Sequence, residues 1–195
     1  MGVNLNTSIF TLGHYNYDID IFVSILADYD ISTVVDVRSY PFSKRNIQYR
    51  KDTMSYLLHN RGIKYVFLGD KLGGMSEDES LFTEGILDYK KVTSTEKFKS
   101  GIDILSNVAS SCIVSIVCTE QDPLRCHRFG MISPVLRDLG FQVNHILGKG
   151  HVKTQDELEH DLMSLYSEYD LDKAYQHLNN TIGYEFRFVR KRRQK

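Results

Sequence analysis

The sequence predicts an α/β fold with a Rossmann-like, mostly parallel five-stranded sheet, helices on both faces and a C-terminal helical appendage. Short β-branched or aromatic runs alternate with longer amphipathic runs, which is typical of βαβ units. At least one short run, STVVDV, is continuous enough to be buried on both sides, as in a parallel sheet. From Gly148 onward the alternation stops, and longer polar helical patterns replace it.

The first part of the chain supplies three strands and two helices. The predicted strands are residues 8–12, 32–37 and 64–68, and the predicted helices are residues 18–29 and 51–62. Ile21, Ile25 and Leu26 would share one face of the first helix. Gly62 is expected to close the second helix at its C-terminal cap.

The second part begins with residues 69–93, the longest segment without clear periodicity. We interpret this segment as a partial lid, because long irregular segments in compact domains tend to be functional or disordered. Residues 94–110 are then predicted to form a helix that begins with Ser94, Thr95 and Glu96 in N-cap-like positions. The remaining predicted elements are a central strand at 112–118, a helix at 122–140 and a last strand at 141–146.

The chain divides into an α/β domain, residues 1–147, and an extension, residues 148–195. We expect helices at 154–169 and 171–178 in the extension, the first with an acidic outer face. The end of the chain, YEFRFVRKRRQK, carries six Lys or Arg and one Glu. Such a tail favours an acidic or anionic partner.

Composition restricts the class of protein. Hydrophobic residues make up 42% and charged residues 25% of the chain, which is ordinary for a globular domain. The three cysteines form no even disulfide framework, so we expect a cytoplasmic protein. We predict no membrane partner, because no run approaches the roughly 20 apolar residues that span a bilayer and no signal-peptide pattern is present.

The unusual polar residues follow the predicted strands. In open parallel sheets, ligands bind beyond the carboxyl ends of the strands. The residues at those ends are Gly13 and His14, Asp36 and Arg38, Gly73 and Gly74, Cys118, and His145. We therefore predict a site at this edge of the sheet.

The stretch CTEQDPLRCHR, residues 118–128, contains the strongest candidates for chemistry. Pro123 suits the first position of a helix, whose free N–H groups would face Cys118 and favour an anion, with help from Arg125 and Arg128. A thiol in such a place should have a lowered pKa. Cys126 or Cys118 would then be a nucleophile, and the candidates for its base are His14, His127 and His145.

Each of these residues also has a plainer interpretation. Free cysteines often pack as small hydrophobic residues, which is what we expect of Cys112. Asp36 and Arg38 point to the same face of a strand, and in the plainer interpretation they simply pair with each other. We predict no cofactor, because the two cysteines lack the close spacing of structural zinc sites. The alternative is zinc, with ligands from Cys118, Cys126, His14 and His127.

The loop SYPFSKRNIQYRK, residues 39–51, interleaves cations such as Arg45 with aromatic side chains. Stacking surfaces and cations together are what a nucleotide or single-stranded nucleic acid requires. The tail at residues 187–195 has the same character. A solvated loop and a mobile chain end are the alternatives.

These motifs together resemble a known family. TLGHYNYDIDIFVSIL, VVDVRSYPFSKRNIQYRKDTMSYLL, GIKYVFLGDKLGG and SIVCTEQDPLRCHRFGMI resemble, in this order, the family called domain of unknown function 488, over residues 8–147. The resemblance implies a shared fold and a shared site. It carries over to Gly13, His14, Asp36, Arg38, Pro41, Gly73, Gly74, Cys118, Cys126, His127 and Arg128.

A weaker likeness is to rhodanese-type domains, on VVDVR, SIVC and LRDLGF. The glycine-containing anion loop that follows a rhodanese cysteine is replaced here by TEQDPLRC, which argues against sulfurtransferase activity.

The sequence thus favours an enzyme, or a degenerate enzyme, that binds an anionic small molecule or nucleotide. Its predicted catalytic residues are Cys126, Cys118, His14 and His127, and its predicted anion-binding residues are Asp36, Arg38, Gly73, Gly74, Arg128 and Arg45. Two alternatives stay open. One is a non-catalytic nucleic-acid-binding module that uses residues 39–51 and 187–195, and the other is a protein-interaction domain.

Overall fold

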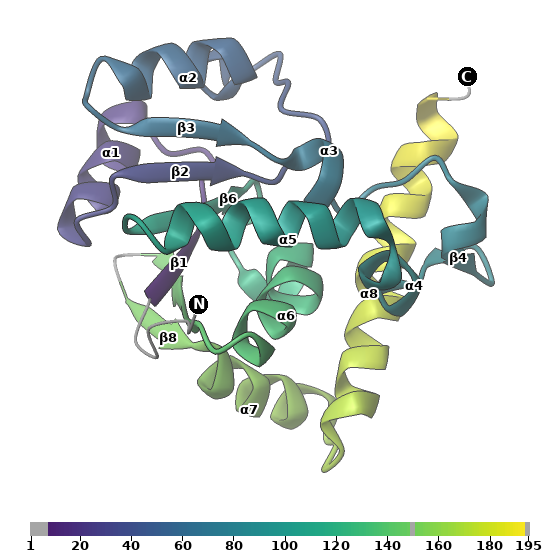
Figure 1. The fold of residues 1–195 in the computed structure, drawn as a ribbon. Helices are drawn as coiled ribbons and strands as arrows, with labels where there is room; N and C mark the ends of the chain where they lie inside the picture. Colours follow the sequence, from purple (N-terminus) through teal and green to yellow (C-terminus); the bar gives the residue numbers. More distant parts are fainter. Residues whose placement is uncertain (1–7, 149–150, 194–195) are drawn as a thin grey trace.

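The computed structural model describes residues 8–148 and 151–193 and confirms the α/β fold (Figure 1). Its central sheet has six strands in the order β3-β2-β6-β1-β7-β8. The strands are β1 (Ser8–Gly13), β2 (Thr33–Asp36), β3 (Lys64–Phe67), β6 (Val114–Cys118), β7 (Gln142–Ile146) and β8 (Val152–Thr154). The five predicted strands run parallel, and the additional strand, β8, pairs antiparallel with β7.

The helices predicted at residues 18–29, 51–62 and 94–110 are present with similar bounds, and the helix predicted at 171–178 is longer in the structure. The helices of the structure are α1 (Ile19–Asp28), α2 (Lys51–His59), α3 (Gly69–Leu72), α4 (Tyr89–Ser94), α5 (Glu96–Ala109), α6 (Ser133–Asp138), α7 (Gln155–Tyr166) and α8 (Leu171–Arg193). Of the three N-cap candidates, Thr95 caps α5, because its side chain accepts a hydrogen bond from the Phe98 N–H. Among the helices of the described residues, none is both long and apolar enough to cross a membrane.

Two buried clusters of apolar side chains cover the two faces of the sheet. Phe22 and Leu26 of α1 and Met54 and Leu58 of α2 pack in one cluster. Phe98, Ile102 and Leu105 of α5 pack in the other, together with residues of α6, α7 and α8. Successive strand residues point to opposite faces, so Val34 belongs to the first cluster and Val35 to the second.

The prediction of one helix over residues 122–140 is wrong. Pro123–Arg125 forms only a 3₁₀ turn, and Cys126 after it is extended, with φ −139° and ψ 139°. A π-helical turn, Arg128–Ile132, then leads into α6. Pro134 near the start of α6 has no N–H to donate, so a regular hydrogen-bond ladder cannot run through it. Because its backbone is extended, Cys126 lies at a bend and not in the first turn of an α-helix.

The segment 69–93 is built from short elements. Besides α3 and α4 it contains a 3₁₀ turn, Glu79–Leu81, and a hairpin of β4 (Phe82–Thr83) and β5 (Ile86–Leu87). Both residues of the hairpin turn have positive φ, 52° at Glu84 and 76° at Gly85, which suits the twist of a two-residue hairpin. Elements this short leave no periodic pattern in the sequence.

The residues after 148 contribute to the same sheet and the same core. β8 extends the sheet, and a capping box of Thr154 and Glu157 begins α7. The buried side chains of α7 and α8 that join the α5 cluster are Leu158, Leu162, Ala174, Leu178 and Ile182. Figure 1 shows α8 as a long helix, and its contacts include the hairpin strand β5.

A chain of buried hydrogen bonds joins the sheet to these helices. Arg128 Nε donates to Thr11 Oγ1 at 3.3 Å, and Thr11 Oγ1 lies 2.9 Å from His145 Nδ1. On the other side of the ring, His145 Nε2 lies 2.8 Å from Gln155 Oε1, and Gln155 Nε2 donates to Glu159 Oε1 at 3.1 Å. A neutral His145 completes this Arg128–Glu159 chain, because it donates to the amide oxygen and accepts from the hydroxyl.

The buried face of α7 gives a test of its contribution to the core. Leu162 is fully buried and Leu165, on the same helix, is 63% exposed. We expect Leu162→Ala to lower the free energy of unfolding by about 2–5 kcal/mol through lost burial and a residual cavity, and Leu165→Ala to change it by less than about 0.5 kcal/mol. Urea unfolding of both variants measures the difference. Equal small effects would mean that α7 adds nothing to the core.

His145 gives a test of the hydrogen-bond chain. Burial is the main cause that lowers the pKa of His145 from 6.5 to about 3, and the charge of Arg128 lowers it further. Below about pH 6.5 the imidazole of His145 takes up a proton in the unfolded chain but stays neutral in the folded chain. Protonation therefore favours the unfolded chain, and the free energy of unfolding is highest above about pH 6.5 and decreases as the pH falls. Between pH 7 and pH 5, we expect the free energy of unfolding of His145→Gln to decrease by about 2 kcal/mol less than that of wild type.

Urea unfolding at pH 7, 6 and 5 measures this pH dependence. The matched control is His160→Gln, which changes an exposed histidine on α7 and should leave the pH dependence of wild type intact. If wild type and His145→Gln lose stability in parallel as the pH falls, His145 is not held neutral by the fold.

Candidate functional site

The carboxyl ends of the three central strands lie level at one edge of the sheet. Gly13 at the end of β1 pairs with Cys118 at the end of β6, and Asp36 at the end of β2 pairs with Val117. The side chains beyond these ends divide into two groups. One packs against the α1 and α2 cluster, and the other belongs to the α5 and α6 cluster on the opposite face.

The first group is a closed network of His14, Asp36 and Arg38. Arg38 Nε and Nη2 donate to the two Asp36 oxygens at 2.9 and 2.6 Å. Arg38 Nη1 donates to the Tyr49 carbonyl at 2.8 Å and lies 3.0 Å from His14 Nε2. The Tyr65 hydroxyl donates to Asp36 at 2.6 Å. Asp36 and Arg38 therefore pair with each other, as the plainer interpretation of the sequence expected.

His14 is fixed within this network on every side. Its ring stacks on Tyr49 with centroids 3.9 Å apart, and its Nδ1 lies 2.8 Å from the Tyr15 carbonyl. Burial first, and then the charge of Arg38, lower the pKa of His14 to about 4. The ring is therefore neutral near pH 7, with Nδ1 donating to Tyr15 and Nε2 accepting from Arg38. Neither ring nitrogen has a lone pair or proton free for a ligand.

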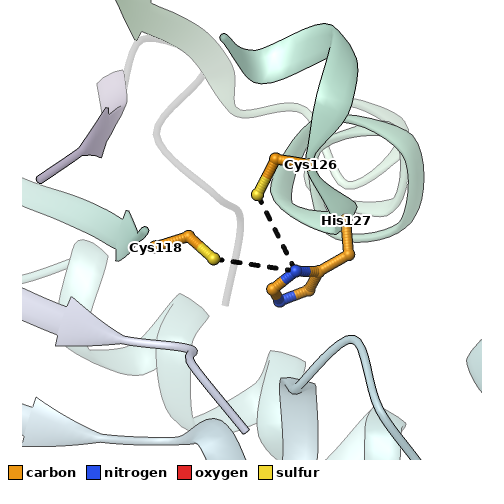
Figure 2. A group of neighbouring side chains, drawn as sticks. All are labelled: Cys118, Cys126 and His127. Atoms are coloured by element: carbon orange, nitrogen blue, oxygen red, sulfur yellow. Dashed lines mark hydrogen bonds between the residues drawn. The ribbon is translucent and has the colours of Figure 1, made fainter. Parts of the chain in front are cut away.

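The second group, which we call the thiol–imidazole cluster, consists of Cys118, Glu120, Cys126 and His127. His127 Nδ1 lies 3.8 Å from each of the two sulfur atoms, so the ring faces both cysteines (Figure 2). Glu120 Oε2 lies 2.9 Å from the Cys118 sulfur and 3.3 Å from the Cys126 sulfur, and it can accept a hydrogen bond from either sulfur that carries a proton. On its other side, His127 Nε2 lies 3.2 Å from the Val37 carbonyl and can donate to it.

The cluster favours a thiolate on Cys126. Burial alone would raise the pKa of Cys126, but the hydrogen bond from Cys118 and the charges of Arg128 and His127 bring it well below the usual value. The same hydrogen bond, and burial, raise the pKa of Cys118. Burial would lower the pKa of His127, but the adjacent Cys126 sulfur raises it. The arrangement can thus share a proton between a thiol and an imidazole.

Two glycines and Arg128 bring the pieces of the cluster together. A Cβ on Gly13 would lie 1.8 Å from the Glu120 carbonyl oxygen, and a Cβ on Gly74 would lie 2.7 Å from the His127 ring. Any side chain at either position would push these segments apart. Arg128 Nη1 donates to the Glu120 carbonyl at 2.6 Å, and Nη2 donates to the Gln121 carbonyl at 3.0 Å.

The other predicted residues lie around these two groups. Arg128 is fully buried and donates to backbone carbonyls, and Arg45 is exposed on the loop 39–51. Gly73 packs against Ser39, where a Cβ would meet the Ser39 Oγ at 2.4 Å. The predicted helix N-terminus facing Cys118 belongs to a 3₁₀ turn of three residues. The side chains of residues 187–195 lie outside the described part of the chain.

Sequence reasoning missed three residues that complete the two groups. Glu120 contacts both cysteine sulfurs, and its spacing of two from Cys118 was a usable signal, because alternate residues of an extended chain share a face. Tyr49 and Tyr65 complete the His14 network. Their motifs carried no signal, since one lies on a 3₁₀ turn and the other on an edge strand.

Comparison with known proteins gives one result. The family model described as "Domain of unknown function DUF488" matches residues 18–132. No curated protein and no solved structure matches the chain. The likeness to rhodanese-type domains stays a prediction.

The matched span covers more than half of the chain and contains both groups except for His14. The thiol–imidazole cluster lies within it from Cys118 to His127. The chain therefore belongs to the DUF488 family, as its motifs predicted.

Proposed function

We propose that this protein is an enzyme that acts on an anionic, phosphate- or nucleotide-bearing substrate, with the thiol–imidazole cluster as its reaction centre. The observation that carries the proposal is the position of His127, whose Nδ1 lies 3.8 Å from both sulfurs. Buried ionisable groups cost folding free energy unless they are well paired, and they concentrate at functional sites. Apolar side chains would fill this part of the core at lower cost.

The preference for an anion rests on the charges around the cluster. Arg128 is buried beside the two sulfurs and contributes positive potential there. Arg38 and Arg128 donate hydrogen bonds to partners within the protein. In this proposal they therefore position the site and do not bind the substrate directly. Lys44 and Arg45 are exposed on the loop 39–51 and would attract the substrate to this edge.

Access to the cluster is part of the proposal. Cys126 is fully buried, and Gly74 lies against the His127 ring. The neighbouring Met75 N–H donates to the Ser39 hydroxyl at 3.0 Å. A substrate would therefore displace the segment 73–77, which is the lid role that the sequence predicts for this region. We further propose a cytoplasmic location, because three free thiols suit a reducing compartment.

Binding and turnover test this function. We would measure binding of inorganic phosphate, pyrophosphate, AMP and ATP by calorimetry, and conversion of each by mass spectrometry, in the absence of chelators. We expect at least one anion to be bound and converted, and Cys126→Ser to lower the conversion on the order of 100-fold or more. The matched control is Cys112→Ser, since the Cys112 sulfur contacts Thr33 and the Val108 carbonyl outside the cluster.

Conversion at the wild-type rate by Cys126→Ser would place the chemistry elsewhere. Binding of none of the four anions would contradict the proposed substrate class. Far-UV circular dichroism of each variant separates lost chemistry from lost folding.

We propose nucleic-acid binding as the second candidate, because the loop 39–51 exposes aromatic and cationic side chains together. Phe42 is 64% and Tyr40 is 42% exposed, beside the exposed Lys44 and Arg45. We expect affinity for a single-stranded oligonucleotide, measured by fluorescence anisotropy, to fall steeply with salt. Phe42→Ala should weaken it, and Cys118→Ser with Cys126→Ser should not. Absence of binding at low salt would remove this candidate.

A further inference from the structure

We propose that the thiol–imidazole cluster binds a zinc ion through Cys118 Sγ, Cys126 Sγ and His127 Nδ1. These three atoms all lie within 4.8 Å of one another. They come from the end of β6 and from the bend before the π-helical turn, and Figure 2 shows them pointing toward one common point. The inference rests on the proposed function in that it names the cofactor of the same site.

The distances suit tetrahedral coordination. Zinc binds thiolate sulfur at about 2.3 Å and imidazole nitrogen at about 2.0–2.1 Å, which separates a sulfur ligand from a nitrogen ligand by roughly 3.5 Å. His127 Nδ1 lies 3.8 Å from each sulfur. Two zinc-bound sulfurs lie roughly 3.8 Å apart. All three ligand atoms lie within 4.8 Å of one another, so the side chains would close on an ion by movements of about 1 Å or less.

The orientation of His127 also suits a metal ligand. A metal-binding imidazole usually donates its other N–H to a carbonyl or carboxylate, which fixes the tautomer and the ring plane. His127 Nε2 has such a partner in the Val37 carbonyl, at 3.2 Å. Nδ1 is then left with its lone pair directed at the two cysteines. Gly74, which has no side chain, packs against the ring and keeps it in place.

Charge and ligand type indicate which ion the cluster takes. Two thiolates and an imidazole are soft and borderline ligands, which select zinc over calcium or magnesium. The cysteines and His127 are buried, so negative charge on the sulfurs needs a cation at close range. The buried guanidinium of Arg128 donates to backbone carbonyls and to Thr11. A dication between the sulfurs would supply the missing charge.

The number of protein ligands indicates a catalytic and not a structural site. Structural zinc sites are closed by four protein ligands, whereas catalytic sites have three and leave the fourth position to water or substrate. A zinc ion bound in this way acts as a Lewis acid and lowers the pKa of the water bound to it. The Glu120 carboxylate, next to both sulfurs, is the nearest group that would handle a proton there.

The metal content of the purified full-length chain tests the inference without any substrate. The chain is incubated with zinc chloride, desalted and measured by inductively coupled plasma mass spectrometry. We expect about one zinc per chain in wild type and in Cys112→Ser, the matched control whose cysteine lies outside the cluster. Cys118→Ser and Cys126→Ser should each reduce the zinc to background.

A second measurement keeps the inference testable if a variant fails to fold. Wild type loaded with cobalt(II) in place of zinc should show the charge-transfer absorption of thiolate ligands. The inference is overturned if wild type retains no zinc, if Cys118→Ser and Cys126→Ser both keep a full equivalent, or if the cobalt form lacks thiolate absorption. Zinc without turnover would defeat only the proposed enzyme, and turnover without zinc would defeat only the metal site.

Discussion

The buried guanidinium of Arg128 is the interaction on which the site and the packing of the C-terminal helices both depend. Its Nη1 and Nη2 hold the carbonyls of Glu120 and Gln121, and so fix the turn that follows Cys118. Its Nε begins the chain of hydrogen bonds that ends at Glu159. A buried charged side chain is tolerated when its N–H groups have hydrogen-bond acceptors. Removal of one of these partners strongly lowers the stability of the fold. One side chain thus connects the chemistry at the sheet edge to the helices behind it.

Close backbone contacts do the rest of the assembly. The turn after β6 lies directly on the end of β1 because Gly13 has no side chain, and the segment after α3 lies on His127 because Gly74 has none. The cluster is therefore built from parts of the chain that are far apart in sequence, and only the folded sheet brings them together. Its geometry depends on the missing side chains at Gly13 and Gly74 as much as on the two thiols.

The sequence predicts the parallel strands well, because short β-branched runs such as STVVDV favour a buried strand over a helix. It fails at residues 122–140, where the helical pattern is present but the chain bends at Cys126 to bring that sulfur to Cys118 and Glu120. The site residues were of the right types, yet they divide between two faces of the sheet. The acceptors that occupy Arg38 and Arg128 include backbone carbonyls, which leave no trace in a sequence.

The antiparallel strand β8 determines which strand forms one exposed edge of the sheet. An exposed strand edge is a template for pairing with another chain, and natural proteins blunt such edges with short or charged strands. β8 offers only Val152–Thr154 at one edge, and β3 offers Lys64–Phe67, with an exposed lysine, at the other. Without β8, the mostly buried strand β7 would form that edge. β8 therefore covers the edge of β7 and replaces it with a shorter strand edge.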